Sequence, residues 1–180
     1  MDEPNELTPE DAGHAARIQE FWEVARIRAG LMRTAVVTGM TTAATMPPPA
    51  WAFGDNPVLA DELLDLVLSG SKTATATSLT ELEADGDRLP EVGDLSIVLD
   101  GSGEPRALIR TTAVDVTTFA EVTEAQAYAE GEDDRSLVSW RREHEKYFRR
   151  VLEPLGTAFS EDLPVVIETF ELLYPHPSDR

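Results

Sequence analysis

The segment from Asn56 to Leu79 constrains the fold most, because a strong helical pattern passes there directly into a strand pattern. Asn56 and Pro57 are typical of the N-cap and first position of a helix, and Gly70 is typical of its C-cap. Apolar residues at three- and four-residue spacing indicate one buried stripe on this helix: Leu59, Leu63, Leu66 and Val67. Threonine and alanine then alternate up to Leu79, as in a β-strand. This segment predicts a helix, a short turn and a strand.

Lys72 lies in that turn and stands out by composition. The chain has 15 basic residues, but only Lys72 and Lys146 are lysines. Lysine can lose its proton when it is desolvated, whereas arginine stays protonated, so Lys72 is a candidate for proton chemistry or anion binding. The alternative is a solvated lysine near a helix C-terminus, where a cation is favourable. Lys72 can converge with Thr75 only if it precedes the strand, because in a regular strand the two would point to opposite faces.

The remaining pattern predicts further helices and strands around this segment. Helical spacing covers residues 13–33, 120–128 and 136–152. Strand patterns cover residues 95–99, 106–119 and 164–174, with a short apolar piece at 51–54 and a hairpin-type turn at 100–103. The acidic stretch 81–93 is predicted to be turns. Residues 34–50 end in three prolines and are predicted to be a linker with weak strand character at Val36 and Val37.

The predicted helix 136–152 carries two features that bear on function. Basic residues lie along the side opposite its apolar residues: Arg142, Lys146, Arg149 and Arg150. Glu143 and Glu145 between them favour a solvated face, and the alternative is an anion-binding stripe. His144 lies on the apolar side, where a histidine is more often a satisfied core residue than a catalyst.

Composition excludes several classes of function. The net charge of −19 repels polyanions at long range, so a nucleic-acid ligand must be small or bound at a local site. The chain has no cysteine, and no spacing of histidine, aspartate or glutamate predicts a metal site, so we expect neither a metal nor a cofactor. Neither a signal sequence nor an apolar run of ~20 residues is found, and we expect a cytoplasmic protein without membrane contact.

Several motifs, in order along the chain, together resemble the ASCH domain family. They are Phe53-Gly54-Asp55, Ala60 to Leu63, Ser69 to Thr75, Leu89 to Asp94, Tyr128 to Glu132, Asp134 to Leu137 with Trp140-Arg141, and Phe159 to Asp162 with Pro164 to Val166. The resemblance divides the chain into an N-terminal helix with a Pro-rich connection (1–50), an ASCH domain (51–174) and a tail (175–180). Residues 34–49 look longer than the usual connection. The implied fold is α+β, a small PUA-like β-barrel flanked by helices with an N-terminal helical extension.

The resemblance also implies a class of function and a site. ASCH domains are associated with RNA, and members similar to this chain include an amidohydrolase that deacetylates N4-acetylcytidine, and ribonucleases. The implied catalytic residues are Lys72, Thr75 and Glu132, with Glu130 as the competitor for the carboxylate. The implied ligand-binding residues are Thr73, Trp51, Arg135, Ser136, Trp140 and Arg141. We therefore predict binding of RNA or a modified nucleoside in a cleft between barrel and helices, with amidohydrolase or ribonuclease activity as alternatives.

Lys72 can serve amide hydrolysis in two ways. As a neutral amine it would take the proton of the Thr75 hydroxyl, which is a poor nucleophile without a base. A nearby glutamate favours the ammonium instead, and Lys72 would then stabilise the oxyanion. The residues alone leave both roles open.

Overall fold

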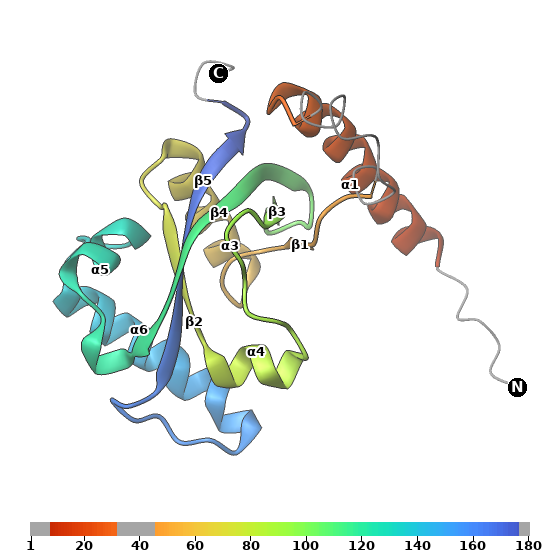
Figure 1. Cartoon of the computed structure of the whole chain (residues 1–180). Helices are drawn as coiled ribbons and strands as arrows, with labels where there is room; N and C mark the ends of the chain where they lie inside the picture. Colours follow the sequence, from red (N-terminus) through yellow and green to blue (C-terminus); the bar gives the residue numbers. More distant parts are fainter. Residues whose placement is uncertain (1–7, 32–45, 177–180) are drawn as a thin grey trace, which may run out of the picture. The chain divides into compact units, whose positions relative to one another are not determined.

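The computed structural model describes residues 8–31 and 46–176, which form a mixed α+β fold (Figure 1). In order, its elements are α1 (Pro9–Arg28), β1 (Ala50–Trp51), α3 (Pro57–Ser69), β2 (Ala74–Ser78), α4 (Leu79–Asp85), β3 (Leu95–Leu99), β4 (Pro105–Thr118), α5 (Glu124–Glu130), α6 (Leu137–Leu152) and β5 (Pro164–Tyr174). Short 3-10 turns follow β4 and α6. The strands form one sheet in the order β1-β3-β4-β5-β2, with β1 parallel to β3 and β2 antiparallel to β5. The predicted fold class and the N-terminal helix are confirmed.

The chain divides into two compact units, and each has its own apolar cluster. The first comprises the described parts of residues 1–64, 95–109 and 173–180. In it, α1 packs Trp22 and Ala25 against Ile97 of β3 and Leu108 of β4. Burial of these side chains holds the N-terminal helix on the strands, because removing apolar surface from water is the main stabilising term in folding. None of the described helices is long and apolar enough to cross a bilayer.

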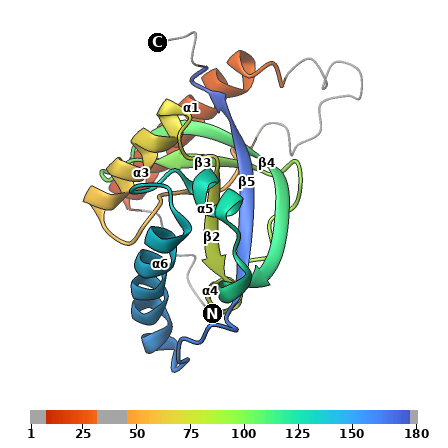
Figure 2. The ribbon, with the colours of Figure 1, turned by 90° about the vertical axis from the view of Figure 1, so that its left-hand side faces the viewer.

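The second unit comprises residues 65–94 and 110–172, and it contains the candidate site. Its α6 runs alongside β2 (Figure 2). The core between them is apolar and is supplied by α6, β2 and β5: Trp140, Phe148, Leu152, Ala74, Ala76, Val165 and Ile167. Since side chains alternate along a strand, Thr75 and Thr77 lie on the other face of β2. The core therefore decides which strand residues face the helices.

The predicted elements are largely confirmed, although α1 covers Pro9–Arg28 rather than 13–33 and α5 covers Glu124–Glu130 rather than 120–128. The strands 95–99 and 164–174 have the predicted limits, and Asn56 caps α3 by accepting a hydrogen bond from the Leu59 amide at 3.0 Å. The strand after Lys72 begins later, at Ala74, and the first strand is Ala50–Trp51 rather than 51–54. Residues 32–45, including the strand character expected at Val36 and Val37, lie outside the described residues.

The prediction of turns throughout residues 81–93 was wrong, because α4 occupies 79–85. A reciprocal capping box starts this helix. The Ser78 hydroxyl accepts from the Glu81 amide, and the Glu81 carboxylate accepts from the Ser78 amide, both at 3.2 Å. The box satisfies two amide groups that a helix start otherwise leaves without partners. The acidic composition of residues 81–93 favoured a prediction of turns, so the capping box was not recognised.

Candidate functional site

Lys72 is buried between two glutamates. Its side chain is 1% exposed, and its Nζ lies 2.6 Å from Glu132 Oε1 and 3.3 Å from Glu130 Oε2. These distances give the buried side chain two salt bridges. The alternative of a solvated turn lysine is therefore wrong, and the ammonium is a fixed charge inside the protein.

The end of α3 places Lys72 in this position. Gly70 has a φ of 77°, and the amides of Ser71 and Lys72 both donate to the Leu66 carbonyl, at 2.9 and 3.0 Å. The Thr73 amide then donates to the Ala129 carbonyl at 2.7 Å, and β2 begins at the next residue. Lys72 is thus held in the turn by backbone hydrogen bonds on both sides.

Gly131 brings the two glutamates to the lysine. It follows the last residue of α5, Glu130, and has a φ of 74°. A Cβ atom at this position would clash with the carbonyl of Ser71, so the close approach of the two chain segments requires glycine. Glu130 and Glu132 flank this glycine and therefore both reach Lys72.

Glu130 is a carboxylate in the core of the second unit. Its Oε1 accepts a hydrogen bond from Trp140 Nε1 at 2.6 Å, and its Oε2 lies 3.4 Å from His144 Nε2. Burial opposes ionisation, but the positive charges of His144 and Lys72 and the hydrogen bonds from His144 and Trp140 outweigh it. Together they lower the pKa of Glu130 to about 2.

His144 is the fourth ionisable group of this cluster, and its role was missed in the sequence. It is buried, as expected, and its ring stacks on Trp140 with a centroid distance of 4.1 Å. Burial disfavours the imidazolium, but the charge and hydrogen bond of Glu130 outweigh it and raise the pKa of His144. The sequence placed His144 on an apolar helix face but held no indication that a carboxylate from α5 meets it there.

Glu132 gives the cluster its access to solvent. Its side chain is 29% exposed, against 1% for Lys72 and 2% for Glu130. The loop that carries it is shaped by left-handed residues, with φ of 47° at Asp133 and 64° at Arg135. Arg135 fixes the loop, because its Nη2 donates to the Ser71 carbonyl at 2.7 Å and its guanidinium lies over the Tyr128 ring at 4.1 Å. A ligand that approaches this cluster meets Glu132 first.

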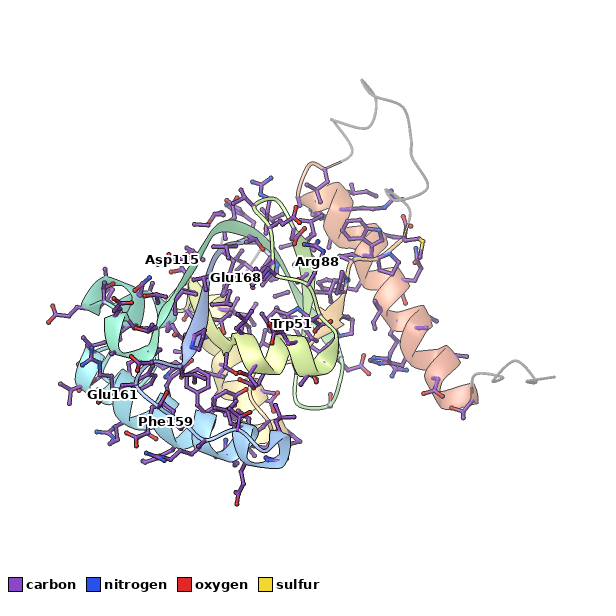
Figure 3. The ribbon with its side chains drawn as sticks, turned by 60° about the horizontal axis from the view of Figure 1, so that its bottom comes forward. Trp51, Arg88, Asp115, Phe159, Glu161 and Glu168 are labelled. Carbon is purple, nitrogen blue, oxygen red and sulfur yellow. The ribbon has the colours of Figure 1, made fainter. Side chains whose placement is uncertain are left out.

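Thr75 lies in β2, directly opposite Glu168 of β5. Directly opposed residues of an antiparallel pair share one face of the sheet. Glu168, labelled in Figure 3, accepts a hydrogen bond from the Thr111 hydroxyl at 2.5 Å, and burial raises its pKa. The structure thus brings Lys72 and Glu132 together and sets Thr75 beside Glu168, and a catalytic role for Thr75 stays a prediction.

Three of the predicted ligand-binding residues hold local structure in place. The Thr73 hydroxyl donates to the Ala129 carbonyl at 3.2 Å, and the Ser136 hydroxyl caps α6 by accepting from the Ser139 amide at 3.1 Å. Arg135 fixes the Glu132 loop as described. These contacts hold the backbone next to the site in place. Direct contact of the three residues with a ligand stays a prediction.

The other three predicted ligand-binding residues make contacts with groups other than Lys72 and Glu132. Trp140 is 5% exposed and is bonded to Glu130, so a stacking role would need its ring to be uncovered. Arg141 donates through Nη2 to the Ala120 carbonyl at 2.7 Å. Trp51 belongs to the first unit, where its ring meets the edge of Phe53 at 4.7 Å. Their ligand roles also stay predictions.

The basic side of α6 is paired with acidic neighbours. Arg142 lies 2.9 Å from Asp133, Lys146 lies 3.0 Å from Glu143, and Arg149 lies 2.7 Å from Glu145. All three cations are more than half exposed, so such pairs stabilise the fold little. The contacts favour a solvated face over an anion-binding stripe. Among the described residues no cluster of three or more potential metal ligands is found.

Comparisons with known proteins find a matching family model and similar solved structures. The model of the ASCH domain family matches residues 49–174. Protein EF3133 from Enterococcus faecalis V583 is 31% identical over 88% of this chain and 91% of its own, with a TM-score of 0.71. An ASCH domain from Lactobacillus crispatus JV V101 is 29% identical over 82% of this chain and 94% of its own, with a TM-score of 0.67. No curated protein matches the chain.

Proposed function

Because the chain belongs to the ASCH domain family, we propose that it binds RNA or a nucleoside at a local site built around Lys72, Glu130 and Glu132. The observation that supports this most is the buried ammonium with a partly exposed carboxylate 2.6 Å away. Such a pair offers a hydrogen-bond acceptor at the surface and a fixed positive charge behind it. Glutamate accepts hydrogen bonds from the exocyclic amine of cytosine, so a cytidine-type base fits this arrangement.

The charge of the chain favours a compact ligand. With a net charge of −19, the protein repels the phosphate backbone of a long nucleic acid. Lys72 and Arg135 supply positive charge locally, and an unpaired base exposes the edge that hydrogen-bonding side chains can reach. A nucleoside or a single unpaired nucleotide is therefore the favoured ligand.

Calorimetry with cytidine, uridine, adenosine and a short single-stranded RNA tests this proposal. Glu132→Gln removes the charge of the accessible carboxylate, and Glu145→Gln, on the exposed side of α6, is the control. We expect cytidine to bind the wild type and the control equally. Glu132→Gln should bind cytidine roughly 5- to 150-fold more weakly, which is the cost of one good base contact. Failure of the wild type to bind any of these probes would refute the proposal.

A second candidate function is hydrolysis of N4-acetylcytidine. The tight pairing of Lys72 with Glu132 favours the oxyanion-stabilising role of the lysine over its use as a neutral base. In this reaction Glu132 takes a proton from water, and the water oxygen bonds to the acetyl carbon. The bond from that carbon to N4 then breaks and N4 receives the proton, which gives cytidine and acetic acid, and the acid releases its remaining proton to solvent as acetate. This route uses water as the nucleophile, so the nucleophilic role that the resemblance implies for Thr75 stays a separate prediction, and Glu130 stays the alternative to Glu132 for the carboxylate.

Mass spectrometry of cytidine and acetate released from N4-acetylcytidine tests the hydrolase. The wild type should release both products in equal amounts, Glu132→Gln should lose at least about a hundredfold in rate, and Glu145→Gln should keep it. Thr75→Val examines the predicted nucleophile. Binding without any release would leave the protein a binding module, and the same samples with RNA would show whether ribonuclease activity is present.

A further inference from the structure

His144 has oxygen acceptors at both of its ring nitrogens. Nδ1 lies 3.1 Å from the Trp140 carbonyl oxygen, and Nε2 lies 3.4 Å from Glu130 Oε2. A neutral imidazole has one donor nitrogen and one acceptor nitrogen, so it would set a lone pair against one of these oxygens. An imidazolium donates from both nitrogens and satisfies both contacts.

The surrounding charges balance only when His144 is protonated. The cluster then contains two cations, Lys72 and His144, and two anions, Glu130 and Glu132. Glu130 is 1% exposed as a residue, and an uncompensated charge at such a position is costly. With a neutral histidine, Glu130 and Glu132 would compete for the single ammonium of Lys72.

We propose that His144 is a positioning residue of the candidate site, whose imidazolium neutralises Glu130 and so leaves the Lys72 ammonium to Glu132. The distances agree, because Lys72 Nζ is closer to Glu132, at 2.6 Å, than to Glu130, at 3.3 Å. The consequence for ligand binding rests on the proposed function, whereas the charge state of His144 does not.

Ionisable and aromatic groups from three segments around the ring bear on this charge. From α6, Trp140 stacks on the ring and Phe148 lies at a centroid distance of 5.9 Å. The end of α5 and the loop after it bring Glu130 and Glu132, which favour the proton, and the turn before β2 brings Lys72, which opposes it. Burial of the ring is the largest opposing influence, but the carboxylates outweigh both it and the charge of Lys72, so the pKa of His144 is raised above its ordinary value.

NMR of the histidine side-chain nitrogens during a pH titration from about 5 to about 9 tests the charge state. His144→Gln assigns the resonance by its loss. We expect both ring nitrogens of His144 to be protonated at about pH 6.5, the ordinary pKa of histidine, and Glu130→Gln to shift the titration to lower pH. A single neutral tautomer of His144 at about pH 6.5 in the wild type would overturn the proposal.

Calorimetry with cytidine tests the positioning role separately. At a pH below the pKa of His144, His144→Gln should bind cytidine about tenfold or more weakly than the wild type. The affinity of the wild type should fall as pH rises through that pKa, and His144→Gln should lack this fall. Adding Glu130→Gln to His144→Gln removes both charges, so the double variant should recover most of the affinity for cytidine. The double variant also tests the positioning role if the single variant folds poorly. Lys146→Gln, on the exposed side of α6, controls for loss of a cation.

The outcomes separate the two proposals. If the wild type binds cytidine but His144→Gln binds it equally well with the same pH profile, the positioning role is overturned. If the double variant binds no better than His144→Gln, the charge compensation between Glu130 and His144 is also refuted. If the wild type binds no nucleoside, the proposed function fails, while the NMR titration still decides the charge of His144.

Discussion

The two lysines of the chain sit in opposite environments. Lys72 is 1% exposed and pairs with two glutamates, whereas Lys146 is 62% exposed and pairs with Glu143 on the surface of α6. A buried charge left without its partner is costly, and an exposed pair contributes little. The same substitution at the two positions removes one positive charge each time, so a difference in its effect on stability reports the burial of Lys72.

We expect Lys72→Met to lower the free energy of unfolding by about 3–5 kcal/mol, because it removes the cation paired with Glu132 and leaves the buried cluster with two carboxylates and only His144 as a cation. Lys146→Met should change it by less than about 0.5 kcal/mol. Urea unfolding of both variants beside the wild type provides the measurement. Adding Glu130→Gln to Lys72→Met should recover part of the loss, and equal effects of the two lysine substitutions would contradict the buried pair.

Gly131 combines a left-handed backbone with a close approach to Ser71. Gly156 has a similar φ of 69° but has no atom within 4 Å of the position of a Cβ. Gly131→Ala should destabilise the protein by about 2–5 kcal/mol and Gly156→Ala by about 1–2 kcal/mol, because only the first adds a clash to the backbone cost. Thermal unfolding of the two variants measures the difference, and matching shifts would rule out the clash.

Glu130 should make stability depend on acid. Its pKa is lowered from 4.5 to about 2, so its contribution is fully present above 4.5 and is lost as pH falls through about 2. The wild type should exceed Glu130→Gln in unfolding free energy at neutral pH, and this excess should shrink as the solution is acidified from pH ~5 towards ~2. Urea unfolding at several pH values measures it. An excess that is independent of pH would mean that the carboxylate is not ionised in the fold.

At the scale of secondary-structure elements, α6 connects the core to the site. It supplies Trp140 and Phe148 to the apolar cluster and His144 to the charge cluster. Its start is held by the Ser136 hydroxyl, which accepts from the Ser139 amide at 3.1 Å. Because α6 contributes to both clusters, a substitution that weakens this cap should destabilise both.

Ser136→Ala should cost about 1 kcal/mol of stability, because the hydroxyl satisfies an amide that the helix start leaves free. Ser136→Asn should keep most of the stability, since asparagine caps a helix about as well as serine. Denaturation midpoints of the two variants give the comparison. If both substitutions lower the midpoint equally, the cap is not what the serine contributes.

At the scale of the whole molecule, the charge limits how a nucleic acid can bind. The net charge of −19 repels a phosphate backbone, and Arg142, Lys146 and Arg149 of α6 are each paired with a carboxylate. Binding at a compact site neutralises few phosphates and releases few counterions. The affinity for single-stranded RNA should therefore depend little on the length of the RNA.

Fluorescence anisotropy with single-stranded RNAs of about 4 and about 20 nucleotides should give similar affinities per site, with a slope of log K against log salt no steeper than about −1.5, as for one or two phosphate contacts. The control is a basic RNA-binding domain with the same oligonucleotides, which should show a strong dependence on length and salt. A steep slope for this protein would mean that a larger surface contacts the backbone.

Local patterns determined much of this fold. The limits of α3, β3 and β5 follow from caps and periodicity, because hydrogen bonds at a helix start and alternation in a strand act over a few residues. The helix α4 escaped prediction although its capping box is local, since acidic residues around Ser78 and Glu81 resemble a polar loop. The scarcity of lysine and the family motif also singled out Lys72 as a candidate, and the structure shows that this lysine is buried and paired.

Only the tertiary structure decided what surrounds Lys72. The sequence left Glu130 and Glu132 as competitors for one role, whereas the fold gives both to the lysine and adds His144 behind Glu130. It also sets Thr75 beside Glu168. These contacts join residues far apart in the chain, and burial then sets their charges. Short-range patterns determined the elements, while long-range packing decided which charges meet and how deeply each is shielded from water.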